Sequence, residues 1–151
     1  MEKGNELDNI QENLYSRQIG TYGEEAMKKI LQLKILILGV KGIGIEIAKN
    51  IILTGPERVV IYDPDIVELK DLGTNFYLKE EDINKNRIDY SCLKSLTELN
   101  QYTQVDVLNL RNSNELYIEL PKNNFDIIIQ TEIKPLNEII LLNEYCRKKK
   151  Y

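Results

Sequence analysis

The sequence predicts an α/β fold, namely a doubly wound, mostly parallel Rossmann-like sheet with helices on both faces. Two observations support this prediction. Short apolar runs alternate along the chain with longer amphipathic segments, and the first apolar run leads through a glycine-rich turn into a helical pattern. The apolar runs are the predicted strands: residues 33–38, 58–62, 104–108 and 125–130. The first is apolar almost throughout, as expected for a parallel strand buried on both faces.

Helical patterns lie before, between and after these strands. Residues 14–31 place apolar side chains among charged ones, and Gly20 and Gly23 interrupt the pattern. The helix after the first strand ends near Gly55, and its apolar face comprises Ile45, Ala48, Ile51 and Ile52. Two further helices are predicted, over residues 80–99 and 137–149. Four strands make up most of such a sheet, so we expect it to be incomplete at its C-terminal end.

Size and composition limit the functional classes. The chain has 151 residues, 42% hydrophobic and 29% charged, which suits one folded domain with a core. We expect a polar tail over residues 1–13 and one domain over residues 14–151. The net charge of -4 gives no reason to expect nucleic acid or an anionic membrane as partner. No apolar run approaches the roughly 20 residues of a membrane span, and the N-terminus carries no apolar signal segment. A cytoplasmic and nuclear location is therefore expected.

The chain has few residues of the kinds used for metal binding or nucleophilic catalysis. It contains no His, and its Cys residues, Cys92 and Cys146, are far apart in the sequence. Ser-His and Cys-His nucleophiles are thus excluded, a zinc site has almost no ligands, and we expect no metal site. Each Cys is predicted to be a buried or half-buried structural residue. Any chemistry must use Lys, Arg, Asp, Glu or backbone groups.

The glycine-rich turn departs from the dinucleotide pattern G-x-G-x-x-G. Gly39, Gly44 and Asp63 occupy the first glycine, third glycine and ribose-binding acid positions, whereas Lys41 replaces the second glycine. That glycine normally lets the backbone approach a phosphate, so a lysine side chain there predicts a lost or weakened nucleotide site. Gly42 is an additional glycine. The alternative interpretation is that the glycines serve only strand-to-helix packing and that Asp63 is a strand-end turn residue.

Several blocks in one register resemble the inactive adenylation half of ubiquitin-activating enzymes, members of the ThiF/MoeB-like superfamily. The blocks are LYSRQ at residues 14–18, GVKGIGIEIAKNIIL at 39–53, DL at 71–72, NFYL at 75–78 and EEDINKNR at 80–87. The likeness runs from about Leu14 to Cys146. It implies a pseudosymmetric pair of domains, one of which binds ATP and magnesium and adenylates ubiquitin while the other is degenerate.

The resemblance also implies which residues have lost their role. An arginine that engages ATP in the active half is matched by Thr74, and the region of its magnesium-holding aspartate is matched by Gln130, Thr131 and Glu132. Lys85 and Asp63 match the active pattern. Adenylyl transfer needs cations that offset charge on phosphate. The degenerate site is therefore predicted to comprise Gly39, Lys41, Gly42, Gly44, Asp63, Thr74 and Lys85 and to hold no cofactor.

Arg17 is the one residue for which the resemblance implies a catalytic role. In the family, an arginine from the opening segment of the inactive half reaches the ATP phosphates of the active half, and Arg17 matches it. A guanidinium offers two parallel donors suited to phosphate oxygens. The alternative is that Arg17 is an ordinary surface arginine or an interface ion-pair partner.

The resemblance therefore implies a fragment that is inactive alone and belongs to an ATP-dependent ubiquitin-activating ligase. Its expected partners are the active adenylation half and, through the parent protein, ubiquitin and ubiquitin-conjugating enzymes; ATP and magnesium belong to the parent enzyme. Two alternatives remain open. One is the small subunit of a SUMO-activating enzyme, and the other is an NAD-binding oxidoreductase domain, against which Lys41 counts.

Overall fold

A sheet of four parallel strands forms the centre of the protein. The structure is a computed structural model that describes residues 13–88, 90–110 and 115–149. Its strands are ordered β3-β2-β1-β4. Their bounds are β1 Lys34–Leu38, β2 Arg58–Tyr62, β3 Gln104–Val107 and β4 Ile127–Gln130. Each coincides with a predicted strand to within two residues.

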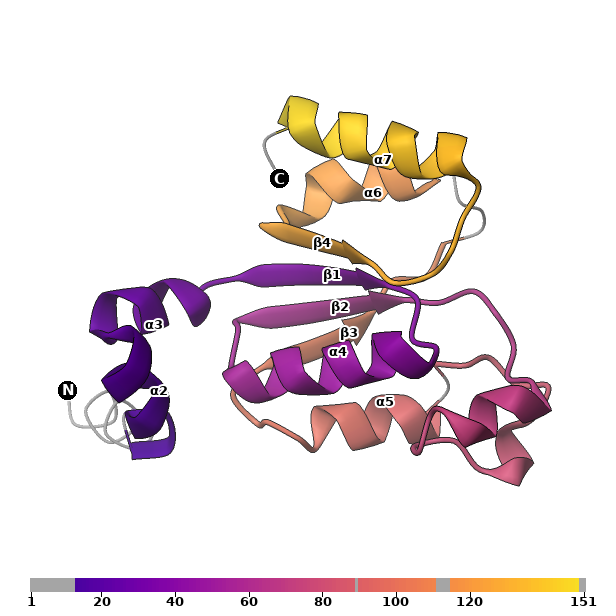
Figure 1. The fold of residues 1–151 in the computed structure, drawn as a ribbon, viewed down its shortest axis with the longest axis horizontal. Helices are drawn as coiled ribbons and strands as arrows, with labels where there is room; N and C mark the ends of the chain where they lie inside the picture. The colour runs from indigo at the N-terminus through magenta and orange to yellow at the C-terminus, as the bar shows by residue number, and fades with distance from the viewer. Residues whose placement is uncertain (1–12, 89, 111–114, 150–151) are drawn as a thin grey trace.

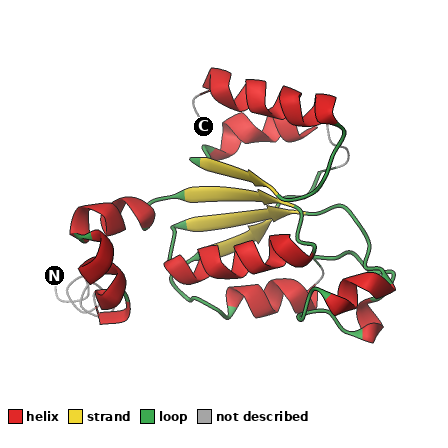
Figure 2. Cartoon of the chain, viewed as in Figure 1, coloured by secondary structure: helices red, strands yellow, loops and turns green. Residues whose placement is uncertain are grey.

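Helices cover both faces of this sheet (Figure 1). Two lie on one face, α4 (Gly42–Thr54) and α5 (Tyr90–Thr97), and two on the other, α6 (Leu116–Asn123) and α7 (Leu136–Lys149). Figure 2 shows the same layers by element type. The predicted doubly wound α/β fold is thereby confirmed. Among the described residues, no helix has the length and apolar character that a membrane span requires.

Alternate side chains of the central strands enter two separate cores. In β1, Ile35 and Ile37 pack beneath α4 and α5, whereas Leu36 and Leu38 pack beneath α6 and α7. Because successive strand residues point to opposite faces, a strand covered on both sides must be apolar at every position. Residues 35–38 are all buried. The fully apolar run in the sequence has this physical origin.

Two short helices form an arm beyond the start of β1 (Figure 1). They are α2 (Ser16–Tyr22) and α3 (Glu24–Ile30), and Gly23 joins them with a positive φ of 85°. The single amphipathic helix expected over residues 14–31 is therefore divided, at one of the two glycines that interrupt the pattern. The arm lies at the amino ends of the strands, opposite the glycine-rich turn.

The predicted helix over residues 80–99 is only half correct. Its second half is α5, but the chain first turns at Asn84, whose φ is +67°. Asn86 then pairs antiparallel with Ile66 in the loop after β2. Asparagine tolerates the left-handed conformation and ends helices, and this local preference outweighed the helical spacing of the apolar residues.

Another difference is α6, a helix of eight residues that the hydrophobic pattern did not reveal. Pro121 lies inside it, and proline in a short segment normally indicates a turn. Leu116 and Leu120 nevertheless anchor α6 in the second core. Tertiary packing therefore stabilises a helix that its local sequence disfavours.

Candidate functional site

The glycine-rich turn lies at the carboxyl edge of the sheet, between two strands whose connections leave in opposite directions. From β1 the chain crosses through α4 to β2, while β4 lies on the other side of β1 and is reached through α6. Ligands of open α/β sheets bind at such a switch point. The turn and the end of β4, at Thr131 and Glu132, are therefore where a nucleotide site would form.

Three glycines of this turn are required by the chain's own packing. A Cβ at Gly39, where φ is +96°, would collide with the side chain of Glu132, and one at Gly44 would collide with the carbonyl of Gly39. A Cβ at Gly42 would lie 2.9 Å from the Cβ of Thr74. The close approach that such glycines normally offer to a phosphate is used here by Glu132 and Thr74.

Glu132 is the side chain that fills the turn. It is only 6% exposed, and its Oε2 lies 3.1 Å from the Nζ of Lys134. Its Oε1 is 3.6 Å from the Nζ of Lys41 and 3.7 Å from Nη1 of Arg87, yet it accepts no hydrogen bond from any described residue. A carboxylate therefore occupies the position against the glycines, and three cations surround it.

Asp63, which occupies the position of a ribose-binding acid, has its carboxylate fully hydrogen-bonded inside the protein. Its carboxylate accepts backbone hydrogen bonds from Val40 (2.9 Å) and Asp65 (3.0 Å). Both of its oxygens also lie 2.8 Å from Nη1 of Arg87. With four such contacts, the carboxylate has no lone pair left for a ribose hydroxyl.

Arg87 is the centre of this network, and its side chain is completely buried. Besides Asp63, it binds Oδ2 of Asp71 (Nη2, 3.1 Å) and the carbonyl of Ile66 (3.2 Å). Burial alone would lower the pKa of Arg87, but its hydrogen bonds and charge interactions with Asp63 and Asp71 raise the pKa above its ordinary value. Arg87 therefore clamps the loop after β2 against the glycine turn as a permanent cation.

Asp71 is held by the same clamp. Burial acts to raise the pKa of its carboxyl, but the backbone N–H of Glu68 and the side chain of Arg87 outweigh burial and lower the pKa below its ordinary value. The hydrogen bond from Glu68 measures 3.0 Å and begins the 3₁₀ helix η1 (Leu69–Gly73). The clamp and the local fold of the loop depend on the same carboxylate.

Lys41 points into the acidic cluster. Its Nζ is 3.3 Å from Asp65 and 3.6 Å from Glu132. Burial lowers its pKa, but the hydrogen bond to Asp65 and the charge of Glu132 more than compensate, so the pKa of Lys41 is raised. The ammonium is therefore fully charged near neutral pH and neutralises the chain's own acids.

The structure brings most of the predicted site residues together. Gly39, Lys41, Gly42, Gly44, Asp63 and Thr74 share the carboxyl edge. Thr74 donates a hydrogen bond to the carbonyl of Asp71 (3.3 Å), next to Gly42. Lys85 instead pairs with Asp82 at 3.7 Å within the loop. Arg17 lies apart from all of them, exposed on α2 at the opposite end of the sheet (Figure 1).

Sequence analysis gave Arg87 no role, although the residue closes the motif EEDINKNR. The signal that could have revealed its position is the pair Asn84 and Asn86, since asparagines at such spacing favour a turn. Glu132 was identified only as an acid near a lost metal ligand.

Three carboxylates of this edge, from Asp63, Asp65 and Glu132, approach one another within 4.8 Å, as metal ligands would. Arg87 and Lys41, however, already contact these acids. A divalent cation would have to displace an ammonium and enter beside a buried guanidinium. The donor set therefore does not fit a resident magnesium ion.

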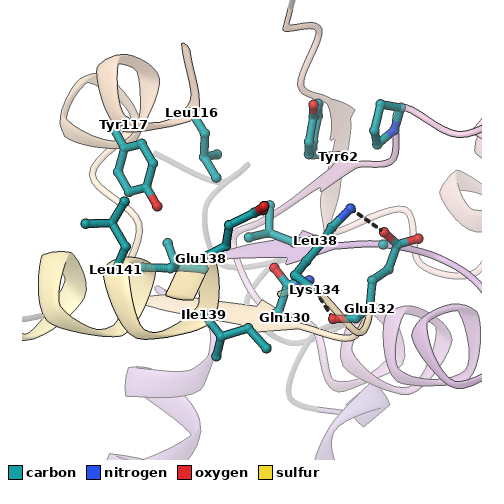
Figure 3. A pocket seen from close by; sticks show the side chains of 13 residues that line it. Leu38, Tyr62, Leu116, Tyr117, Gln130, Glu132, Lys134, Glu138, Ile139 and Leu141 are labelled. Carbon is teal, nitrogen blue, oxygen red and sulfur yellow. Dashed lines mark hydrogen bonds and ion pairs between the residues drawn. The ribbon is translucent and has the colours of Figure 1, made fainter. Parts of the chain in front are cut away.

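A pocket of about 290 Å³ adjoins the filled turn on the side of α6 and α7 (Figure 3). Leu38, Leu116 and Leu142 supply much of its apolar wall, and Glu132 with Lys134 forms its polar rim. Gly39 of the turn also lines this pocket. Among the described residues that line it, the cation is Lys134, which is already paired with Glu132 at 3.1 Å.

The cysteines are structural, as expected. Cys92 is buried in the core beneath α4 and α5, and burial raises the pKa of its thiol to about 12. Cys146 is half-buried on α7, and burial raises its pKa too. Neither thiol forms a thiolate near neutral pH.

Comparison with known proteins places the chain in the superfamily that its sequence motifs resemble. The ThiF family model matches residues 15–151. The chain is 41% identical over 139 residues to "Ubiquitin-activating enzyme E1 1" of Schizosaccharomyces pombe, covering 92% of this chain and 13% of that protein. It is 38% identical over 146 residues to "Ubiquitin-like modifier-activating enzyme 1" of Homo sapiens, covering 97% and 13%. The chain thus spans about an eighth of these relatives' length.

Solved structures share the fold. Escherichia coli tRNA N6-threonylcarbamoyladenosine dehydratase, TcdA, superposes with a TM-score of 0.78 at 17% identity, covering 94% of this chain and 59% of that one. E. coli MccB in a structure with ATP gives 0.71 at 26% identity, covering 89% and 42%. The predicted resemblance to ubiquitin-activating enzymes is confirmed, and the chain is a member of the ThiF family.

Proposed function

We propose that this domain is the degenerate adenylation half of a ubiquitin-activating enzyme, binding no nucleotide itself and supporting an active half. The observation that carries the proposal is the filled turn, in which Glu132 occupies the space against Gly39. MccB, a similar structure, has been solved with ATP. The contrast supports a fold that once served nucleotide binding and whose cradle is now closed by the chain's own side chains.

Electrostatics oppose a phosphate at this edge. A nucleotide phosphate placed at the turn would meet the Glu132 carboxylate, and like charges brought together at a buried site cost several kcal/mol. The nearby cations cannot compensate, since Lys41 and Arg87 are already paired with acids. Thr74 adds no charge where the active pattern has an arginine. Binding would require moving Glu132 away from Gly39 before a phosphate could approach the turn.

The relatives' names favour ubiquitin over SUMO as the modifier of the parent enzyme, since the S. pombe relative is called a ubiquitin-activating enzyme. Because the chain spans only 13% of that protein, ATP, magnesium, ubiquitin and conjugating enzymes would be handled elsewhere in the parent. What this domain would contribute is a rigid scaffold and Arg17.

The position of Arg17 supports a role in trans. Its helix lies beyond the start of β1, while the domain's own turn follows the end of β1 (Figure 1). A strand of five residues is roughly 16 Å long, further than an arginine side chain extends. Arg17 therefore cannot serve the domain's own edge, and any phosphate it meets belongs to another unit.

Exposed apolar side chains support a docking role. Phe76 is 58% exposed although it follows the buried Asn75, and the ammonium of Lys49 lies 5.1 Å from its ring centroid. Ile43 and Leu69 are also exposed. Large exposed apolar side chains are the usual material of an interaction site. Phe76, in the block at residues 75–78, is thus our candidate contact for the active half.

Calorimetry tests the central claim. Titration of this chain with millimolar ATP and magnesium should give no saturable heat, because the turn is filled and its cations are paired. An ATP-binding member of the same fold, such as MccB, provides the positive control. Saturation with a micromolar dissociation constant would contradict the proposal that this half is degenerate.

A further inference from the structure

The arm that carries Arg17 is held to the domain at very few points. Between residues 13 and 33 the buried side chains are those of Tyr15 and Met27. Helix α2 itself has no buried residue. Because burial is what fixes a short helix, Tyr15, which directly precedes α2, is the buried anchor nearest to Arg17 in the chain, and Met27 anchors α3.

Tyr15 is inserted into a socket at the far end of α4. Only 2% of it is exposed, and its hydroxyl accepts a hydrogen bond of 2.9 Å from Nδ2 of Asn100. The same amide group donates to the carbonyl of Ile52, also at 2.9 Å. Gly55 forms the wall, where φ is +85° and any Cβ would collide with the tyrosine hydroxyl.

The socket is built from rigid elements. Ile52 is buried on α4, and the carbonyl it provides belongs to the last turn of that helix. Asn100 follows α5 and is fixed from its other side, since its Oδ1 accepts the N–H of Tyr102 at 3.0 Å. Two helices that pack on the sheet thus determine where the Tyr15 hydroxyl lies.

We propose that Tyr15 is a positioning residue that fixes Arg17 for catalysis, and this inference rests on the proposed role of Arg17 in trans. Arg17 is two positions after Tyr15, in the first turn of α2. A catalytic group contributes fully only when held in its working geometry, and an ångström of misplacement can cost about 10²-fold in rate. The Asn100–Tyr15 hydrogen bond supplies that constraint from the body of the domain.

The test is a double-mutant cycle in the assembled activating enzyme that contains this domain, measuring ATP–pyrophosphate exchange with ubiquitin. Tyr15→Phe keeps the ring and removes only the hydroxyl, so the chain should fold. We expect it to lower kcat about tenfold and Arg17→Ala about 10²-fold. The double variant should be no slower than Arg17→Ala alone, because once the guanidinium is removed its position no longer affects the rate.

Thr103→Val is the matched control. Thr103 is buried and its hydroxyl donates to the same Ile52 carbonyl, at 3.4 Å; among the described residues no hydrogen bond joins its side chain to Tyr15. The variant removes a buried hydrogen bond at the socket without touching the arm. Its thermal midpoint should fall as in Tyr15→Phe, while exchange stays at the wild-type rate.

Each outcome separates the two proposals. Wild-type exchange in Arg17→Ala overturns the trans role of Arg17 and, with it, the reason for the positioning proposal. A loss in Arg17→Ala together with wild-type exchange in Tyr15→Phe overturns the positioning proposal alone. The positioning proposal is also overturned if the rate losses of Tyr15→Phe and Arg17→Ala multiply in the double variant. An equal rate loss in Thr103→Val overturns it too, since either result indicates a general loss of stability.

Discussion

The two ends of the sheet use charge in opposite ways. At the carboxyl edge, Arg87 is completely buried and bound to Asp63 and Asp71, while Lys41 is tied to Asp65 and Glu132. At the amino end, Arg17 is exposed on a short arm. A cation that is paired inside the protein contributes to the fold and cannot bind a ligand, whereas an exposed cation can still contact a ligand. Under the proposed function, this difference is how a domain without a nucleotide site of its own would still serve the site of another domain.

Removing Arg87 should have the largest effect on stability. Arg87→Met leaves Asp63 and Asp71 buried without their cation, and breaking a buried pair in this way costs about 3–5 kcal/mol. Urea unfolding followed by circular dichroism measures the loss. Arg58→Met is the control, because the Arg58–Asp106 pair, at 2.7 Å, is partly exposed and should be worth less than about 1 kcal/mol. Equal losses in the two variants would mean that the buried network does not hold the edge together.

At the other end of the sheet, Arg17 should matter through catalysis. In the assembled enzyme, Arg17→Ala should slow ATP–pyrophosphate exchange about 10²-fold, the usual cost of one preorganised charge contact. Arg17→Lys should recover only part of the rate, since it keeps the charge and loses the planar pair of donors. Full recovery by lysine would show that the site needs only a positive charge near the phosphates.

Much of the fold could be predicted because it depends on local pattern. Residues 35–38 are apolar at every position because helices cover both faces of β1. Gly39 and Gly44 marked the turn correctly, since the Glu132 side chain excludes a Cβ at Gly39 and the backbone of Gly39 excludes one at Gly44. Helix α6 escaped prediction because its stability comes from Leu116 and Leu120 in the second core, which no local pattern reports.

The side chains that fill the glycine-rich turn were harder to predict from the sequence. Lys41 and Thr74 showed that the usual pattern was broken, but they did not show what fills the turn. That depends on Glu132, which is 93 positions from Gly39 in the chain and reaches it only because β4 pairs with β1. Arg87 likewise meets Asp63 only because the loop turns back at Asn84. Contacts between distant segments follow from topology, and residue spacing does not encode them.

The buried clamp should also give the domain an acid-sensitive stability. The pKa of Asp71 is lower in the folded protein than its ordinary value. A carboxyl of this kind stabilises the fold above its unfolded pKa of about 3.9, and that contribution is lost as the pH falls through the lower, folded pKa. The free energy of unfolding should therefore decrease below about pH 4. In Asp71→Asn the decrease over the same interval should be smaller; an unchanged slope would assign the acid sensitivity to other carboxyls.

The smallest expected effect is that of Arg17→Ala on this chain alone. Helix α2 buries none of its residues, and the Arg17 side chain is exposed. Substitutions at such positions usually change the free energy of unfolding by less than about 0.5 kcal/mol. Urea unfolding of wild type and Arg17→Ala measures the difference, with Tyr15→Phe as the reference that removes a buried hydrogen bond in the same arm, worth about 1 kcal/mol. A loss in Arg17→Ala as large as that in Tyr15→Phe would show that Arg17 helps to hold the arm. The slower exchange expected of the assembled enzyme would then reflect a displaced arm, and the two ends of the sheet would no longer differ in how they use their arginines.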